Sequence, residues 1–180
     1  MQSETVIVAA IRTGNIRRAV ELLLDTYQEE LFGYCARLVG LRDSMLTYQR
    51  VLAAALEQIA AFDPKISIRA WLYGIARTIV LQHHRQHTDD HPEARGASYV
   101  PTSGPPDTLG LRLKDDPLDG AVERLTPAVQ EILQLAVWQG LTLEEVAYVV
   151  GRTPAGVRRL ACEGLAQLSL DVQRGSSAPS

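Results

Sequence analysis

The segment "RAWLYGIARTIVLQHHRQH", residues 69–87, carries the residue types that hold nucleic acids. The chain has a formal net charge of −3, yet no Asp or Glu occurs from Lys65 to Thr88, a window that contains three of the four histidines. Arginine offers charge and planar donors to phosphate, and Trp or Tyr offers a stacking face to unpaired bases. The composition therefore favours contact with a polyanion.

Helical periodicity sorts this segment into three lines. A core stripe within about 60° of the helical wheel contains Ile68, Leu72, Ile75 and Ile79. A second line, within about 80°, contains Arg69, Tyr73, Arg77 and His84. A third line, about 60° wide, contains Trp71, Thr78, Gln82 and Arg85. A solvated surface helix with a half-buried Trp71 would give the same pattern, so both interpretations stay open on the pattern alone.

The histidines raise the alternative of a metal site. His83 and His87 are four residues apart and share a helix face, with His84 and His91 nearby. No Cys or carboxylate stands at ligand spacing inside this helix, so a cationic helix end beside phosphate is favoured and no metal is expected. The sequence also lacks a nucleophile–base pair, a phosphate loop and a carboxylate dyad. We therefore expect no enzymatic activity, no catalytic residue and no cofactor.

A second motif, "LTLEEVAYVVGRTPAGVRRL" at residues 141–160, predicts a helix-turn-helix. Thr142 and Glu145 form a capping box, and Gly151 suits the left-handed turn that ends the first helix. Thr153 then caps a second helix with Pro154 in its first turn. The expected DNA-reading residues of this unit are Arg152, Thr153, Pro154, Ala155, Arg158 and Arg159. A plain helical hairpin is the alternative.

The fold class predicted from periodicity is all-α, with two small helical domains. Helices are expected at residues 4–12, 15–39, 43–61 and 67–87, which form a first domain over residues 1–87. Residues 88–117 contain five prolines and six carboxylates against three Lys or Arg, and this composition predicts a linker. Residues 118–172 form the second domain, and residues 173–180 a disordered tail.

Two cysteines far apart exclude a disulfide framework, and the chain has neither 18 consecutive apolar residues nor a secretory signal. We therefore expect a cytoplasmic protein without membrane insertion.

Taken together, the two motifs resemble those of the extracytoplasmic-function (ECF) sigma factors of bacterial RNA polymerase, over nearly all of residues 4–170. "FDPKISIRAWLYGIAR" is similar to the family's FDP…FRAWLYxIAR element, and "LTPAVQEILQLAVWQGLTLEEVAYVVGRTPAGVRRL" is similar to its second domain. The resemblance implies that the first domain binds the polymerase clamp and the melted minus-ten strand. It implies that the helix-turn-helix reads the minus-thirty-five duplex.

The same resemblance implies the partners: core RNA polymerase, promoter DNA and an anti-sigma factor. Within the matched clamp-binding helix, the polymerase-binding residues would be Asp43, Gln49, Arg50 and Leu52. The chain departs from the family here, because Met45, Leu46 and Arg50 stand where carboxylates are usual. It also departs at Thr78 and Gln82, in place of Asn and Asp, and at Cys162-Glu163, in place of a His-Arg pair. The departures at residues 45, 46, 50, 78 and 82 favour an alternative, a sigma-like regulator that binds a protein partner or duplex DNA without directing initiation.

Overall fold

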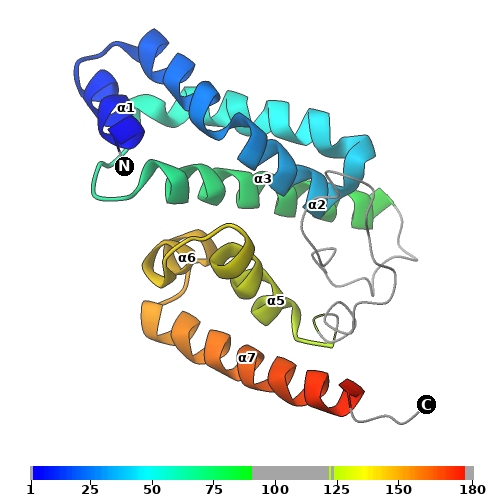
Figure 1. The fold of residues 1–180 in the computed structure, drawn as a ribbon. Coiled ribbons are helices and arrows are strands. Elements are labelled where there is room, and N and C mark those ends of the chain that lie inside the picture. The colour runs from blue at the N-terminus through cyan, green and yellow to red at the C-terminus, as the bar shows by residue number, and fades with distance from the viewer. Residues whose placement is uncertain (1, 91–121, 123, 177–180) are drawn as a thin grey trace. The chain divides into compact units, whose positions relative to one another are not determined.

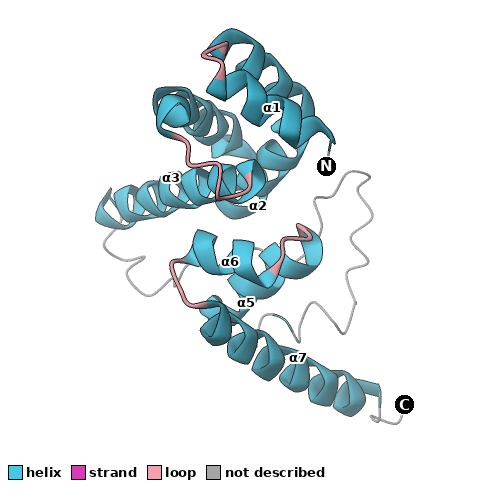
Figure 2. Ribbon diagram, turned by 90° about the vertical axis from the view of Figure 1, so that its left-hand side faces the viewer, coloured by secondary structure: helices cyan, strands magenta, loops and turns pink. Residues whose placement is uncertain are grey.

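The computed structural model describes residues 2–90, 122 and 124–176 of the chain. The chain divides into two compact units, Met1–Pro92 and Glu93–Ser180, which are described separately below. Every regular element in the described ranges is a helix (Figures 1 and 2), which confirms the predicted all-α class. Most of the predicted linker, residues 91–117, lies outside the described residues.

The first unit contains α1 (Gln2–Arg12), α2 (Ile16–Gln58), a 3-10 turn η1 (Ile59–Ala61) and α3 (Ile68–Asp90). Gly40 interrupts α2 with φ 80° and ψ 162°, a conformation that L side chains rarely adopt. The helix therefore consists of a first segment, residues 16–39, and a second segment, residues 41–58. Phe32 and Tyr48 meet edge to face, with ring centroids 5.8 Å apart, so the two segments fold back on each other.

The start of α3 is fixed by a carboxylate from another helix. The backbone N–H of Ile68 donates a 2.6 Å hydrogen bond to Glu4 of α1, and the N–H of Ala70 donates to the Ser67 hydroxyl at 3.0 Å. These bonds satisfy N–H groups that have no partner inside the helix. Helix α3 ends at Asp90, three residues after the predicted end at His87. Thr88 and Asp89 are compatible with a helix, and Pro92 is the first residue that opposes it.

The core of the first unit forms where α3 packs against both segments of α2. Tyr34 and Tyr73 are both about 1% exposed and pack edge to face at 4.8 Å, and Phe62 packs on Trp71 at 5.3 Å. Cys35 is fully buried in the same core. This packing turns a large part of α3 away from solvent.

The second unit contains α5 (Pro127–Leu133), a π-helical turn η3 (Gln134–Trp138), α6 (Leu143–Val150) and α7 (Pro154–Ser176). Leu125, Val129 and Leu133 form its core cluster, on which the partly buried Trp138, Leu160 and Leu168 pack. Helix α7 continues into the predicted tail and ends at Ser176, next to Gly175. Residues 173 and 174 are ordinary helix residues, so the first stop signal is this glycine.

Gly164 lets α7 approach α5 closely. A Cβ atom at this position would lie 2.3 Å from Cγ1 of Val129 and 3.3 Å from Cδ1 of Leu133. Both neighbours belong to the core cluster and are buried, so they have little room to move. The glycine thus sets the distance between the two helices.

We expect Gly164→Ala to lower the free energy of unfolding by about 1–3 kcal/mol, because overpacking outweighs the gain in helix propensity of roughly 1 kcal/mol. Urea unfolding followed by circular dichroism measures the change. Gln167→Ala, an exposed site on the same helix, is the matched control and should change stability by less than about 0.5 kcal/mol. Equal stability of Gly164→Ala and the native chain would contradict the close approach.

The two cysteines should differ sharply in reactivity. Burial raises the pKa of the Cys35 thiol from 9.0 to about 12, whereas Cys162 is exposed. A disulfide reagent should therefore label Cys162 at once and Cys35 only on unfolding.

The raised pKa of Cys35 also makes the stability of the fold depend on pH, because the folded chain holds the thiol proton more tightly than the unfolded chain does. The contribution of Cys35 to the free energy of unfolding is complete below pH 9 and is lost as the pH approaches 12. Cys35→Ala should reduce this alkaline loss of stability, measured by urea unfolding across that range.

Candidate nucleic-acid interface

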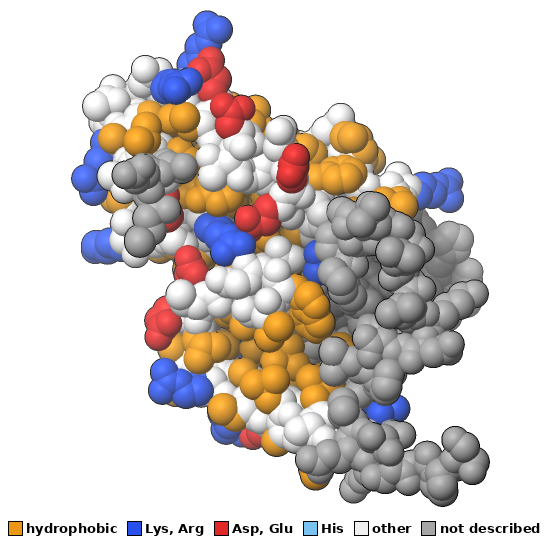
Figure 3. All heavy atoms as spheres, in the orientation of Figure 1, with side chains coloured by type: hydrophobic (Ala, Val, Ile, Leu, Met, Phe, Trp, Pro, Cys, Tyr) orange, Lys and Arg blue, Asp and Glu red, His pale blue; other side chains and the backbone are white. Residues whose placement is uncertain are grey.

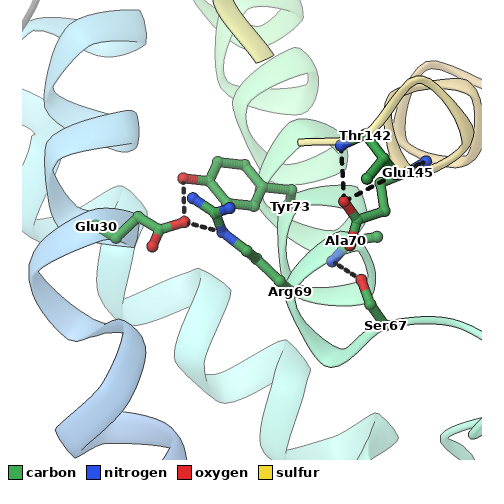
Figure 4. A network of polar contacts seen from close by, with 7 residues as sticks. All are labelled: Glu30, Ser67, Arg69, Ala70, Tyr73, Thr142 and Glu145. Carbon is green, nitrogen blue, oxygen red and sulfur yellow. Dashed lines mark hydrogen bonds and ion pairs between the residues drawn. The ribbon is translucent and has the colours of Figure 1, made fainter. Parts of the chain in front are cut away.

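The second unit contains the predicted helix-turn-helix. The Glu145 backbone N–H donates to the Thr142 hydroxyl at 3.2 Å, and the Thr142 N–H donates to the Glu145 carboxylate at 2.8 Å. This capping box, shown in Figure 4, starts α6. Gly151 ends the helix in the left-handed region, with φ 67° and ψ 39°. Val146 and Val157 are fully buried and hold α6 against α7.

The start of α7 presents an exposed cationic face. The six residues predicted to read DNA here are all exposed: Arg152, Thr153, Pro154, Ala155, Arg158 and Arg159. Arg159 lies 3.6 Å from Glu163, but both side chains are more than half exposed, so this ion pair is weak. Arg152 and Arg158 make no ion pair with any residue that the structure describes. Three guanidinium groups are thus available at one turn and the helix that follows it.

Gly156, which weakens the helix on propensity alone, has a local reason in the cap of α7. Its backbone N–H donates to Oγ1 of Thr153 at 3.2 Å, and a Cβ atom at residue 156 would lie 3.1 Å from the same oxygen. A larger residue would crowd the capping hydroxyl. Glycine therefore keeps the start of α7 compact.

In the first unit, the side chains of Arg69 and Tyr73 form hydrogen bonds within the protein. Glu30 of α2 accepts hydrogen bonds from Nε of Arg69 at 2.6 Å and from the Tyr73 hydroxyl at 2.8 Å (Figure 4). Burial, and next the Glu30 charge, raise the pKa of Tyr73. The Tyr73 ring also packs on Tyr34, which removes its face from solvent. We therefore assign Arg69 and Tyr73 to the packing of α3 and leave them out of the proposed DNA surface.

Trp71 is also unavailable for stacking on a base, because it is 7% exposed and packs on Phe62. The solvent-facing residues of the two predicted lines are Thr78, Gln82 and Arg85, while Arg77 and His84 are partly buried. The Thr78 hydroxyl bonds the Gly74 carbonyl of its own helix at 2.9 Å. The available polar face of α3 is therefore its second half rather than its start.

The predicted polymerase-binding residues lie on the second segment of α2. Gln49 and Arg50 are exposed and Leu52 is partly buried. Asp43 lies 3.7 Å from Nε2 of His83 on α3, so part of its charge faces the protein. Met45 and Leu46, at positions where the resemblance implies carboxylates, are 55% and 53% exposed. This surface is therefore more apolar than the resemblance implies.

Within the described residues, no group of three or more His, Cys, Asp or Glu is placed to hold a metal. The side chain of His87 and the whole of His91 lie outside that description. In the same part of the chain, the helices are too short or too polar to cross a membrane.

Comparisons with known proteins agree with this geometry. The family model "Sigma-70, region 4" matches residues 115–168. The chain is 32% identical over 162 residues to the ECF RNA polymerase sigma factor BldN of Streptomyces coelicolor, covering 84% of this chain but only 61% of BldN. It is 26% identical over 168 residues to the RNA polymerase sigma factor CarQ of Myxococcus xanthus, covering 87% and 94% of the two chains.

Two solved structures share the fold. The TM-score is 0.66 both for CnrH, solved in complex with the cytosolic domain of CnrY, and for the sigma factor RpoE, solved with the anti-sigma factor NepR from Bartonella quintana. CnrH is 19% identical, and the match covers 98% of this chain and 99% of CnrH. RpoE is 17% identical, with 85% and 96% covered.

The matched region and the helix-turn-helix thus define a sigma-70 region 4 domain. The chain belongs to the extracytoplasmic-function sigma factors, as a divergent member.

Sequence reasoning missed the residues that position α3. Glu30 stands in an ordinary amphipathic stretch and Glu4 precedes an apolar run, and both find partners about 40 to 60 residues away. The spacing of neighbouring residues in the sequence does not indicate such long-range contacts. Gly164 did leave a signal, a glycine inside an otherwise regular helical pattern, which often marks close packing.

We expect Glu30→Ala to destabilise the first unit by about 2–3 kcal/mol, because it leaves a partly buried guanidinium and a buried hydroxyl without their shared acceptor. Glu29→Ala, at the exposed neighbouring residue, is the matched control and should have little effect. Urea unfolding monitored by tyrosine and tryptophan fluorescence measures both. Similar values for the two variants would remove Glu30 from this role.

Proposed function

We propose that this sigma factor binds core RNA polymerase and directs promoter-specific initiation by recognising minus-ten and minus-thirty-five elements. The observation that carries the proposal is the exposed face of Arg152, Arg158 and Arg159 on a capped helix-turn-helix. Such a helix start fits the major groove, where arginines contact phosphates and base edges. The reaction itself belongs to the polymerase, and the proposed compartment is the cytoplasm.

For the minus-ten strand, the proposal uses the second half of α3. Thr78, Gln82 and Arg85 are exposed there, and Arg77 is partly exposed. Hydroxyl, amide and guanidinium groups can bond both bases and phosphates. Opening of the duplex by an aromatic wedge at Trp71 or Tyr73 is not included, because both rings are buried.

For the polymerase, the proposal uses the exposed part of the second segment of α2, around Gln49, Arg50 and Leu52. The alternative, a sigma-like regulator that holds a protein partner without directing initiation, is favoured by the loss of carboxylates at residues 45, 46 and 50. An anti-sigma factor is a further proposed partner, in line with the RpoE–NepR complex.

Run-off transcription with core polymerase and a randomised promoter library tests the proposed function. Enrichment of promoters with a common upstream and minus-ten element is expected. If the chain forms no stable complex with core polymerase in a pull-down and yields no enriched promoter, the regulator alternative replaces the sigma-factor activity.

The double variant Arg158→Ala, Arg159→Ala should weaken binding to upstream duplex DNA and flatten its salt dependence. Each lost phosphate contact should lower the slope of log K against log salt by about one. Fluorescence anisotropy at several salt concentrations gives the slope. Arg17→Ala, at a 92% exposed arginine in the first unit, is the control and should leave the slope unchanged. A full slope in the double variant would exclude these two arginines as phosphate contacts.

A further inference from the structure

The charged residues of α7 occupy different parts of its exposed face. Figure 3 shows basic side chains at the surface of the second unit where α7 begins. The opposite, inward side of the helix is marked by four buried or partly buried residues: Val157, Leu160, Ala161 and Gly164. On the helical wheel, Ala155 and Arg159 lie within about 30° of the direction opposite this inward line. Arg158 and Glu163 lie about 70° from that direction, on opposite flanks.

These positions give the two arginines different targets on DNA. An α-helix about 10–12 Å wide fills a major groove about 12 Å wide. The centre of its exposed face then lies toward the base edges, and its flanks lie toward the phosphates that form the walls of the groove. Arg159 is therefore placed for a base and Arg158 for a phosphate. The small side chain of Ala155, one turn before Arg159, lets the helix approach the bases closely.

Glu163 is a carboxylate on a flank that would meet phosphate. Its Oε1 atom lies 3.6 Å from Nη1 of Arg159, and the two side chains are 56% and 71% exposed. Such an exposed pair adds little to stability, and an arginine that precedes its glutamate by four residues is the weaker order for a helix. The pair is therefore not explained by the stability of α7. Against DNA of arbitrary sequence, the carboxylate repels phosphate.

We propose that Glu163 is a positioning residue that aims Arg159 at a guanine of the bound duplex. The inference rests on the proposed function only in assuming that α7 reads duplex DNA. With Nη1 held by Glu163, the other donors of the guanidinium group are directed to the centre of the groove, where guanine offers the O6 and N7 acceptors. The pair strengthens there because the groove excludes water from it. Glu163 thus raises selectivity for sequence and lowers affinity for DNA in general.

The test is a selection of duplexes from a randomised pool by the full chain, without polymerase. The native chain should select one position at which guanine is preferred about tenfold or more over the other bases. Glu163→Ala should reduce this preference about fivefold or more. The same variant should bind the unselected pool about two- to threefold more tightly at low ionic strength, and this gain should shrink as salt is added. A merely structural role of Glu163 would weaken both kinds of binding together.

Further variants identify the atoms involved. Arg159→Ala should abolish the preference at the same position, and adding Glu163→Ala to it should change the preference no further. Glu163→Gln keeps an acceptor oxygen for Arg159 and should retain part of the preference. Arg158→Ala should instead weaken all duplexes alike and lower the salt slope by about one. Glu57→Ala, which removes an exposed carboxylate of the first unit, is the matched control and should change neither binding nor preference.

Three results would overturn the inference. The first is a native chain that selects no guanine position. The second is an unchanged preference in Glu163→Ala with native circular dichroism. The third is an effect of Glu163→Ala on the preference that persists in the Arg159→Ala background, because the carboxylate would then act without the arginine.

Run-off transcription with core polymerase separates this inference from the proposed function. A guanine preference that depends on Glu163, together with no enriched promoter, rejects the proposed function alone. Enriched promoters whose upstream element is the same for the native chain and for Glu163→Ala reject this inference alone.

Discussion

The Glu30 carboxylate fixes how α3 lies against α2, because one oxygen accepts from both Arg69 and Tyr73. Two donors that could have faced nucleic acid are thereby held inside the first unit. With Tyr73 packed on Tyr34 and Trp71 on Phe62, the start of α3 becomes part of the core. The exposed polar side chains of α3 that the structure describes lie in its second half, and this constraint shapes the assignment of its DNA-binding residues.

In the second unit, the positions of the helices are fixed in a different way. Its short helices are held by local devices, namely the Thr142–Glu145 capping box, the left-handed Gly151 and the Thr153 cap. The core is formed by α5 and α7, whose approach depends on Gly164. The arginines at the start of α7 carry none of this packing, so they remain exposed for a ligand. The three arginines of the proposed DNA contact are therefore distinct from the residues that stabilise this unit.

The features of this molecule that could be predicted from the sequence are those fixed by interactions between residues close together in the chain. The helix-turn-helix was predicted residue by residue, because caps, turns and helix periodicity are local signals. The end of a helix at residue 39, immediately before Gly40, was predicted for the same reason. The wheel analysis of α3 placed Tyr73 and Trp71 on polar lines, whereas both are buried. A helix covered on two sides by α2 has a wide buried face, and the sequence of α3 alone does not reveal how many neighbours will cover it.

Gly40 has a consequence for how the first unit folds. By reversing the chain within one residue, it brings two halves of α2 together that are close in sequence, as the Phe32–Tyr48 contact shows. Pairing such neighbours costs little loop-closure entropy, whereas the bond from Glu4 to Ile68 must close a far longer loop. We therefore expect the α2 hairpin to form first and α1 to dock onto the start of α3 afterwards.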